Sequence, residues 1–288
     1  MPRIAVAGSL NQDLFAYVSR LPRPGETLRA VRTARQLGGK GFNQAVALRR
    51  LGSEVEMAGA VGTDEEAGTF ERALDALKIG RAHLRRLDGP TGLALITVDD
   101  SGENTIVLEP GANLRLLPEM LHPLDPQPDA ILVQGELRPE TTTRALELAG
   151  GLKVLNPAPA SLDLSQAVAL ADVVVVNEGE AADMGGTDRM RGLGAAIVVV
   201  TLGPRGAMVE NTLVPAPRIT AVDSTGAGDA FCAALTLALV EGRPIDEAVA
   251  WANRAGAAAC LRPGTSQAMP SRAEVDELDL PGRGAASG

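Results

Sequence analysis

The chain has 288 residues, of which 45% are hydrophobic and 22% charged, and its formal net charge at neutral pH is −9. This length allows a large buried core, and the acidic balance excludes a surface built to bind nucleic acid or anionic lipid. Aromatic residues make up only 2% of the chain, so we expect a core made mostly of Ala, Val, Leu and Ile.

The N-terminus and the two cysteines indicate a cytoplasmic protein. Residues 1–4 lead directly into an apolar segment and lack the shape of a signal peptide. No apolar run reaches the roughly 18 residues that a membrane span needs. Cys232 and Cys260 lie in Ala-rich helical contexts without a Cys-x-x-Cys spacing, so we expect buried free thiols, as in a reducing compartment.

The first predicted strand, Arg3–Gly8, is a short continuous apolar run and is followed by polar side chains. Asn11 and Asp13 come just after its carboxyl end, where open parallel sheets bind ligands. Because they are two residues apart, in an extended segment they share one side and offer an amide and two acceptors to a hydroxyl-rich molecule. An Asx turn would explain the same pair equally well.

The next segments predict a small sheet and a helix. Phe15–Ser19 and Glu26–Ala34 alternate loosely on either side of a Pro-Gly turn, as strands do. Gln36–Gly41 is predicted to open a helix that continues to Arg50. Glycines on both sides of Lys40 let a ligand approach the backbone closely.

A hairpin and a regular alternation of strands and helices follow. Gly92–Asp99 and Asn104–Glu109 form the hairpin, which we expect to join the small sheet. The other predicted strands are Val55–Val61, Asp129–Gln134, Lys153–Asn156, Asp172–Asn177, Ala196–Leu202, Ala207–Glu210 and Leu213–Ala216, and the helices are Asp64–Leu77, Pro139–Ala149, Pro244–Leu261 and Ser271–Leu278. This pattern predicts an α/β fold with a mainly parallel sheet covered by helices on both faces. We find no repeat or linker and expect one domain over 1–288, with Gly282–Gly288 frayed.

Polar residues recur at or just past the ends of the predicted strands. They are Asn11, Asp13, Glu136, Asn177, Glu180 and Thr201. Since the carboxyl ends of parallel strands meet at one edge of a sheet, these positions predict a shared cleft there.

The segment Ile219–Leu239 carries the strongest chemical signal. It is predicted to be a strand end, a turn of small residues and a helix that begins near Gly226. The first turn, Gly226-Ala227-Gly228, leaves backbone N–H groups bare for an anion. Asp229 lies in the same turn and suits a base that acts on a group about to meet a phosphate. The alternative is that Asp229 is only a favourable charge at a helix start.

Two common nucleotide motifs are excluded. The dinucleotide fingerprint needs a third glycine where Phe231 stands, and the Gly39-Lys40 pair is followed by Gly41 rather than by the Ser or Thr of a P-loop. A nucleotide would therefore be bound in another way.

The motifs together resemble the sugar-kinase family that ribokinase typifies, the PfkB carbohydrate kinases. The matching segments run in order and include Gly8-Ser9-x-Asn11-x-Asp13, Gly38-Gly39-Lys40-Gly41-x-Asn43-Gln44-Ala45, Gly111-Ala112-Asn113, Asn177-Glu178-x-Glu180, Thr201-Leu202-Gly203-x-Arg205-Gly206 and Asp223-x-Thr225-x-Ala227-Gly228-Asp229. The resemblance implies a doubly wound sheet, a small β-sheet lid from roughly residues 14–34 and 91–109, and a homodimer formed by the lids. It also implies ATP, Mg²⁺ and K⁺ or another monovalent cation.

The resemblance also implies roles for individual residues. Asp229 would be the general base, and the N–H groups of Gly226, Ala227 and Gly228 would stabilise the transferring phosphoryl group. The sugar would be bound by Asn11, Asp13, Gly39, Lys40, Asn43, Glu136 and Asp229, with Ala94 and Ile96 as an apolar lid wall. The nucleotide side would comprise Asn177, Glu180, Thr201, Gly203, Gly206, Gly228 and Asn253. The monovalent cation would lie near Asp223, Thr225, Ala259, Arg262, Gly264 and Ala268, where the family often has a serine in place of Ala268.

The expected activity is the ATP-dependent phosphorylation of D-ribose at its primary 5-hydroxyl. One alternative is a related kinase that acts on fructose, 2-keto-3-deoxygluconate or adenosine. Another is a non-catalytic sugar or nucleotide sensor on the same fold. His83 and His122 lie outside every motif and are expected at the surface, whereas Trp251 is expected in the core.

Overall fold

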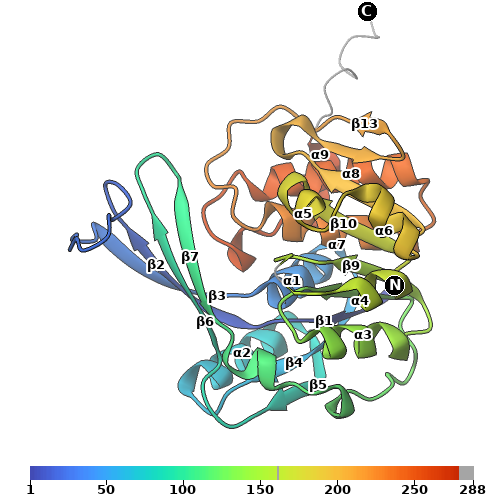
Figure 1. The fold of residues 1–288 in the computed structure, drawn as a ribbon, viewed down its shortest axis with the longest axis horizontal. Coiled ribbons are helices and arrows are strands. Elements are labelled where there is room, and N and C mark those ends of the chain that lie inside the picture. Colours follow the sequence, from blue (N-terminus) through green and yellow to red (C-terminus); the bar gives the residue numbers. More distant parts are fainter. Residues whose placement is uncertain (161, 279–288) are drawn as a thin grey trace, which may run out of the picture.

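The computed structural model describes residues 1–160 and 162–278. Within them, a sheet of nine strands has the order β13-β12-β11-β10-β9-β8-β1-β4-β5. Its strands run parallel except for β12, which pairs antiparallel with both β11 and β13 at one edge of the sheet (Figure 1). The prediction of an α/β fold with a mainly parallel sheet is confirmed.

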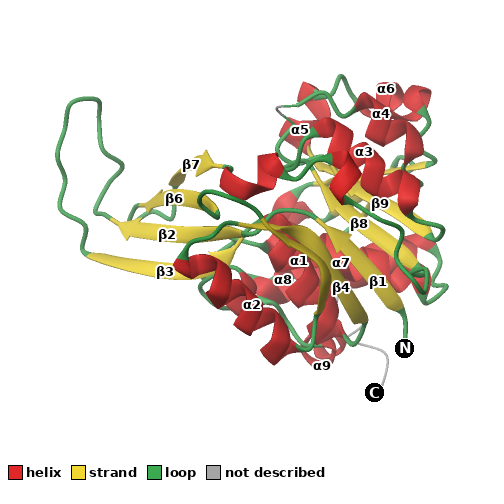
Figure 2. Ribbon diagram, turned by 90° about the horizontal axis from the view of Figure 1, so that it is seen from below, coloured by secondary structure: helices red, strands yellow, loops and turns green. Residues whose placement is uncertain are grey.

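Helices cover both faces of this sheet (Figure 2). The strands are β1 (Arg3–Ala7), β4 (Glu54–Val61), β5 (Gly80–Arg86), β8 (Ala130–Gln134), β9 (Leu152–Asn156), β10 (Val173–Asn177), β11 (Ile197–Thr201), β12 (Ala207–Val209) and β13 (Thr212–Val214). One face carries α1 (Lys40–Leu51), α2 (Glu65–Leu77), α7 (Ala227–Val240), α8 (Ile245–Ala259) and α9 (Arg272–Glu277). The other carries α3 (Pro139–Leu148), α4 (Ser165–Leu170), α5 (Glu178–Asp183) and α6 (Thr187–Leu193).

Two apolar cores result, one on each face, because successive strand residues point to opposite sides. In β1, Ile4 and Val6 pack into the core under α1 and α7, whereas Ala5 and Ala7 pack into the core under α3 and α4. Strands buried on both faces have no polar alternation, which is why they stand out in the sequence as continuous apolar runs. Trp251 is fully buried, as expected.

A second sheet extends away from the main one and is called the lid sheet here (Figure 1). It comprises β2 (Asn11–Tyr17), β3 (Arg32–Gly38), β6 (Gly92–Val98) and β7 (Asn104–Glu109), in the order β3-β2-β6-β7. Phe15, Ala94 and Ile96 form its small apolar cluster. Because β1 leads almost directly into β2, the lid sheet is joined to the centre of the main sheet.

Several predicted boundaries were wrong. The second strand of the lid sheet along the chain, β3, begins at Arg32, not at Glu26, and it continues to Gly38 where a helix was expected to open. Pairing with β2 in the register Asn11↔Gly38 extends this strand into the glycine-rich segment. Gly39 then turns the chain with a φ of +87°, and α1 begins at Lys40. Residues 219–223 form no strand, although a strand end was expected there.

Other elements were missed. The edge strand β5 is half polar and has no apolar run, and α4, α5 and α6 are too short for a clear helical period. His122 is exposed, but His83 is half-buried at β5 rather than at the surface. The expected fraying of Gly282–Gly288 lies outside the described residues. Among the described residues, we find no helix with the length and apolarity that crossing a membrane requires.

Candidate functional site

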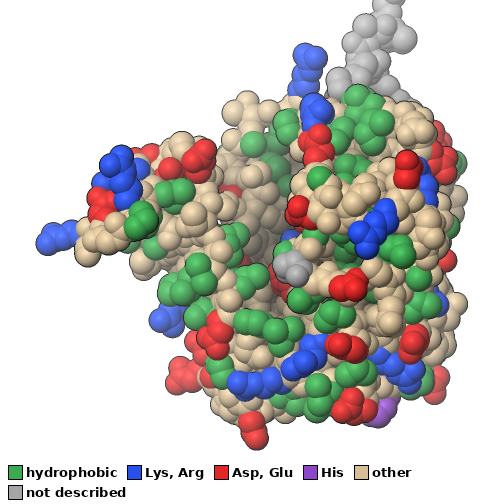
Figure 3. Space-filling model, in the orientation of Figure 1, with side chains coloured by type: hydrophobic (Ala, Val, Ile, Leu, Met, Phe, Trp, Pro, Cys, Tyr) green, Lys and Arg blue, Asp and Glu red, His purple; other side chains and the backbone are tan. Residues whose placement is uncertain are grey.

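Polar side chains gather at the carboxyl edge of the main sheet, where a hollow separates the lid sheet from the body (Figure 3). Asn11 and Asp13 lie on β2 just beyond β1, and Glu136 follows β8. Strands β1 and β8 are neighbours, and from this point the strand order runs in opposite directions. Such a switch point is where open α/β sheets bind ligands.

Asp229 lies in the first turn of α7 and points inward, with only 6% of its surface exposed. Its Oδ2 accepts a hydrogen bond from Asn43 Nδ2 at 3.0 Å, and its Oδ1 accepts one from Gln44 Nε2 at 2.9 Å. Asn43 Oδ1 is buried, and no group of the described residues donates to it. A carboxylate held by two neutral amides, beside a free acceptor, suits a base that meets a hydroxyl group.

The N-terminus of α7 fits an anion. Gly226 adopts the left-handed conformation with a φ of +79°, and a Cβ placed on Gly228 would meet no atom within 4 Å. The space in front of this turn is therefore open to a phosphoryl group, and the helix dipole favours negative charge there. The amide of Ala227 donates to Ser224 O at 3.2 Å, so that group is already engaged in a turn.

Three donors converge on one oxygen of Glu136. Its Oε2 accepts from Asn11 Nδ2 at 3.3 Å, from the Lys40 amide at 3.4 Å, and from the Ser9 hydroxyl. Burial raises the pKa of Glu136, although Lys40 and the Ser9 hydrogen bond oppose the shift. Asn11 is fixed in turn, because its Oδ1 accepts from Asn113 Nδ2 at 2.7 Å.

Asp13 is a second buried acid at this end of the hollow. Burial, together with the charges of Glu136 and Asp229, raises the pKa of Asp13 to about 7, against a hydrogen bond from Thr265 that lowers it. Burial would lower the pKa of Lys40, but the charges of Asp229, Glu136 and other nearby acids outweigh it and raise the pKa. Lys40 is therefore the cation that balances the acids of the site.

Glycines bring α1 against the end of β1. A Cβ on Gly41 would lie 2.6 Å from the carbonyl carbon of Gly8 and 2.6 Å from the amide of Ser9. The Phe42 amide donates to Ser9 O at 3.0 Å across the same contact. This close approach sets the position of Lys40, Asn43 and Gln44 relative to the sheet.

The residues expected on the nucleotide side come from several elements. Asn177 and Thr201 end β10 and β11, Glu180 lies in α5, Gly203 and Gly206 bound the short turn after β11, and Gly228 and Asn253 lie on α7 and α8. Asn177 and Glu180 form a capping box at α5, which uses Oδ1 of Asn177 and one carboxylate oxygen of Glu180. Thr201 Oγ1 donates to Val176 O at 3.3 Å, and Asn253 Nδ2 donates to Val214 O at 2.9 Å. These contacts order the loops and do not by themselves identify a ligand.

The two glycines on the nucleotide side differ. A Cβ on Gly203 would meet no atom within 4 Å, whereas one on Gly206 would lie 2.1 Å from Val214 O. Gly206 therefore permits a close backbone packing, and only Gly203 faces open space.

The residues expected at the cation site form one group of loops. Asp223 Oδ1 accepts from the amide of Thr225 at 2.9 Å, and Asp223 Oδ2 accepts from the amide of Gly264 at 3.0 Å. Ala259 is the last residue of α8. Ala268 lies in a short 3₁₀ turn, and the amide of Ala268 donates to Thr265 O at 3.0 Å. The Arg262 side chain is paired with Glu274 at 2.8 Å.

Sequence reasoning missed three residues of this site. Gln44 donates to Asp229, Ser9 donates to Glu136, and Thr265 Oγ1 donates to Asp13 at 3.4 Å. The signal for Gln44 was a polar side chain directly before the apolar run that begins at Ala45. Nothing in the local sequence pointed to Thr265, because its partner is 252 residues away.

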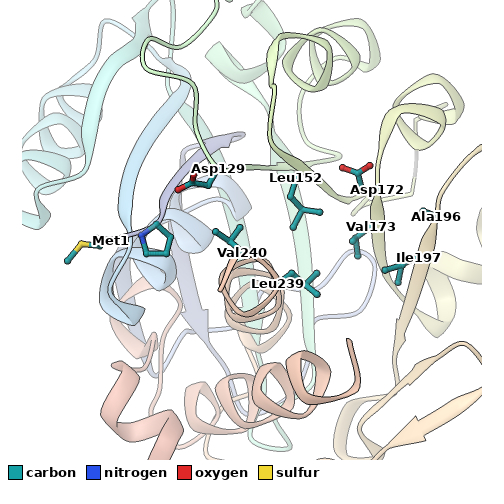
Figure 4. A pocket seen from close by; sticks show the side chains of 10 residues that line it. Met1, Asp129, Leu152, Asp172, Val173, Ala196, Ile197, Leu239 and Val240 are labelled. Atoms are coloured by element: carbon teal, nitrogen blue, oxygen red, sulfur yellow. The ribbon is translucent and has the colours of Figure 1, made fainter. Parts of the chain in front are cut away.

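A wide groove of about 720 Å³ lies at the opposite, amino-terminal edge of the main sheet (Figure 4). Its acids are Asp129 and Asp172, and each accepts a backbone N–H, from Arg3 and Lys153 respectively, at 2.8 Å. Their carboxylates thus cap the starts of neighbouring strands. Among the described residues that line the groove, none is a buried acid or a free acceptor comparable to those around Asp229, so the groove is not the candidate site.

Comparisons with known proteins agree with this fold. The model of the pfkB family of carbohydrate kinases matches residues 1–272. A ribokinase from Haemophilus influenzae is 33% identical and aligns over 96% of this chain and 97% of its own. The crystal structure of a ribokinase from Thermotoga maritima has a TM-score of 0.88 at 31% identity, covering 96% of this chain and 99% of its own.

A further structure, of Arabidopsis thaliana ribokinase complexed with ribose and ATP, has a TM-score of 0.84 at 27% identity, covering 96% of this chain and 98% of its own. The family match and the first relative each span nearly the whole chain. The chain therefore belongs to the pfkB family of carbohydrate kinases.

Proposed function

We propose that the chain transfers the γ-phosphoryl group of ATP to the primary 5-hydroxyl of D-ribose. The observation that carries the proposal is Asp229, a buried carboxylate at the open N-terminus of α7. Its charge helps to raise the pKa of Asp13 and the pKa of Glu136, so the three acids lie close together, and Asn11 contacts Glu136. The similarity to a ribokinase complexed with ribose and ATP supports ribose as acceptor and ATP as donor.

In the proposed mechanism, Asp229 accepts the proton of the primary hydroxyl as the sugar oxygen attacks the γ-phosphorus. The bond between this phosphorus and the β–γ bridging oxygen breaks, and ADP leaves with the electron pair. The backbone amides at Gly226 and Gly228 stabilise the charge on the transferring group, since phosphoryl transfer depends mainly on positioning and electrostatics. A positioned base typically contributes about 10²–10⁴-fold.

The sugar is proposed to bind between the lid sheet and the carboxyl ends of β1 and β8. Asn11, Asp13, Asn43 and Glu136 supply acceptors and amides to its hydroxyls, and the glycine backbone around Lys40 allows close approach. Ala94 and Ile96 form an apolar wall on the lid, where both are buried. An unpaired buried polar group costs about 1–3 kcal/mol, so this pairing selects a hydroxyl-rich ligand.

Mg²⁺ is proposed to accompany the nucleotide near Asn177 and Glu180. The described residues contain no cluster of three His, Cys, Asp or Glu side chains that could hold a metal ion. Mg²⁺ dehydrates reluctantly and is often bound through phosphates and water. A single carboxylate, that of Glu180, fits such a role; the ion, when bound, supplies charge neutralisation of the phosphates.

A monovalent cation is proposed near Asp223, Thr225 and Gly264, with Ala259, Arg262 and Ala268 nearby. The support is Asp223, whose carboxylate accepts from the amides of Thr225 and Gly264 and so holds these two loops together. Carbonyl ligands do not depend on the side chain at Ala268. Because Arg262 pairs its side chain with Glu274, only its backbone oxygen is assigned to the site.

One assay tests these assignments together. ADP formation should require ribose, should stop when Mg²⁺ is chelated, and should fall when K⁺ is replaced by tetramethylammonium. A panel with fructose, 2-deoxyribose, 2-keto-3-deoxygluconate and adenosine identifies the preferred acceptor. If ADP formation does not depend on ribose, the acceptor assignment is contradicted. If the rates in K⁺ and in tetramethylammonium are equal, only the cation site is contradicted.

Ribose binding is expected to weaken below neutral pH. Asp13 must be ionised to accept hydrogen bonds from two hydroxyls, and its pKa is raised to about 7 by burial and by nearby acids. One pH unit below that value, about one tenth of the carboxyl is ionised, so the apparent KM for ribose rises about tenfold at pH 6. Steady-state assays between pH 5.5 and 8.5 measure this, and Asp13→Asn should remove the dependence.

The lid sheet is proposed to form a homodimer with a second copy. On its outer face Leu95 and Val107 are cross-strand partners and are 45% and 65% exposed. Ile106 and Leu108 on the other face of β7 are also 50% and 42% exposed. Apolar surface on both faces of a short edge strand indicates a partner.

Sedimentation velocity should show a species of twice the 29.7 kDa chain mass, and Leu95→Lys with Val107→Lys should convert it to monomer. A monomeric wild-type chain at tens of micromolar would contradict the dimer. The reducing compartment is likewise a proposal, supported by Cys232 and Cys260, which are both buried and free.

A further inference from the structure

A chain of buried amides leads from the main sheet to Asp229. Gln134 ends β8, Asn156 ends β9, and both contact Gln44 on α1. Gln44 and Gln134 are fully buried, and Asn156 is 7% exposed. None of the three belongs to the sugar, nucleotide or cation residues assigned above.

Backbone carbonyls fix the direction of these amides. Asn156 Nδ2 donates to Val175 O at 2.9 Å, which turns Asn156 Oδ1 toward Gln44. Gln134 Nε2 donates to Leu132 O at 3.4 Å and to Gln44 Oε1 at 2.6 Å. A carbonyl can only accept, so neither amide can rotate without losing its bond to the sheet.

The amide of Gln44 is thereby set in one orientation. Its oxygen is occupied by Gln134, and its two N–H groups point to Asn156 Oδ1 at 3.3 Å and to Asp229 Oδ1 at 2.9 Å. Rotation would place the Gln44 oxygen against two acceptors. Asp229 therefore meets a donor whose position is determined by strands β8, β9 and β10.

A contribution to the free energy of unfolding does not by itself explain the buried amides of Gln44, Gln134 and Asn156. Gln134 Oε1 is buried, and no group of the described residues donates to it. A Cβ on Gly8 would lie 1.8 Å from this oxygen, so the backbone at Gly8 leaves the room that Gln134 occupies. Apolar side chains at these buried positions would avoid an unpaired oxygen, and their absence indicates a functional constraint.

We propose that Gln44 is a positioning residue for phosphoryl transfer, held by Gln134 and Asn156, and that it aims the Asp229 carboxylate at the acceptor hydroxyl. With Oδ1 bound to Gln44 and Oδ2 to Asn43, the carboxylate cannot rotate, and its unused lone pairs keep a fixed direction. The inference rests on the proposed function, because it assigns to Asp229 the role of base.

The test is Gln44→Met, which keeps an unbranched side chain of similar length and removes the donor. We expect kcat to fall about 10- to 100-fold, as misplacement of a reacting group does, while the KM for ribose changes less than about twofold. Thr236→Val is the matched control, because it removes a buried hydrogen bond to Cys232 O on the same helix α7 as Asp229. That variant should lose stability and keep its kcat.

A double-mutant cycle separates positioning from general damage. In an Asp229→Asn background, Gln44→Met should have almost no further effect on residual turnover. An equal loss in both backgrounds, an unchanged kcat in Gln44→Met, or a change confined to KM overturns the inference. If Gln44→Met does not fold, Gln134→Met is carried through the same cycle, with a smaller expected loss and the same criteria.

Wild-type turnover is measured first, so that failure of the proposed function can be distinguished from failure of the inference about Gln44. If another sugar replaces ribose in the panel, the acceptor assignment fails and the cycle is run with that sugar. Absence of turnover with every acceptor overturns both the function and the inference, whereas normal turnover with additive losses overturns only the inference.

Discussion

Asp229→Asn is expected to lower kcat by about 10²–10⁴-fold, the range that a positioned general base contributes, while ribose binding persists. The variant keeps the shape of the side chain and loses only the ability to accept a proton. Asn at this position can still accept from Gln44 through its oxygen. Once the Asn43 amide rotates, the new side-chain amide of the variant can donate to Asn43 Oδ1, to which no group of the described residues donates in the wild-type chain.

Steady-state rates measure the first effect and isothermal titration with ribose the second. The melting temperature serves as the control, because the replacement of hydrogen bonds predicts little change in it. Turnover of Asp229→Asn within about threefold of wild type would end the assignment of this carboxylate as base. Loss of ribose binding with normal folding would instead place Asp229 mainly in substrate binding.

Gly41→Ala is expected to cause the second large loss. The added Cβ would lie 2.6 Å from backbone atoms of both Gly8 and Ser9, and backbone cannot yield as a flexible side chain does. Helix α1 must therefore move away from β1, carrying Asn43 and Gln44 away from Asp229. Overpacking costs about 1–3 kcal/mol or more of the free energy of unfolding, and a displacement of about 1 Å can cost about 10²-fold in kcat/KM.

Urea denaturation and steady-state kinetics check the two parts of this prediction. Gly192→Ala in α6 is the matched control, because a Cβ there meets no atom within 4 Å. It should leave kcat/KM unchanged and raise the free energy of unfolding by up to about 1 kcal/mol. If Gly41→Ala behaved like Gly192→Ala, the close contact between α1 and β1 would have no role in placing the site.

The fold and the open N-terminus of α7 could be predicted because local patterns determine them. Continuous Val-rich runs are typical of parallel strands, and a Gly-Ala-Gly turn before an apolar helix marks an open N-terminus. The role of Gln44 could not be predicted, because α1 is buried on nearly all sides and periodicity does not show which neighbour a polar residue meets. Its partner Asp229 is 185 residues away in the chain.

Strand boundaries failed where long-range pairing overrides local preference. The segment Gln36–Gly41 contains three glycines and was expected to open a helix, yet pairing with β2 holds it as strand up to Gly38. The edge strand β5 was missed because its residues are largely polar, and it forms through its pairing with β4. In both cases the strand is determined by pairing with another segment of the chain, and the periodicity of a segment's own sequence does not show that pairing.

The central strands β1 and β8 are neighbours in the sheet, although residues 8–129 separate them in the chain. Asp229, to which Gln44 on α1 donates a hydrogen bond, lies much later in the chain, on α7. During synthesis the N-terminal segments leave the ribosome first. The polar residues at the ends of β1 and β8 are therefore made before α7, which begins in the last quarter of the chain. Premature termination before α7 therefore yields chains that carry Asn11, Asp13 and Glu136 but lack Asp229. On the mechanism proposed above, chains that end before α7 should transfer phosphate far more slowly than the full chain.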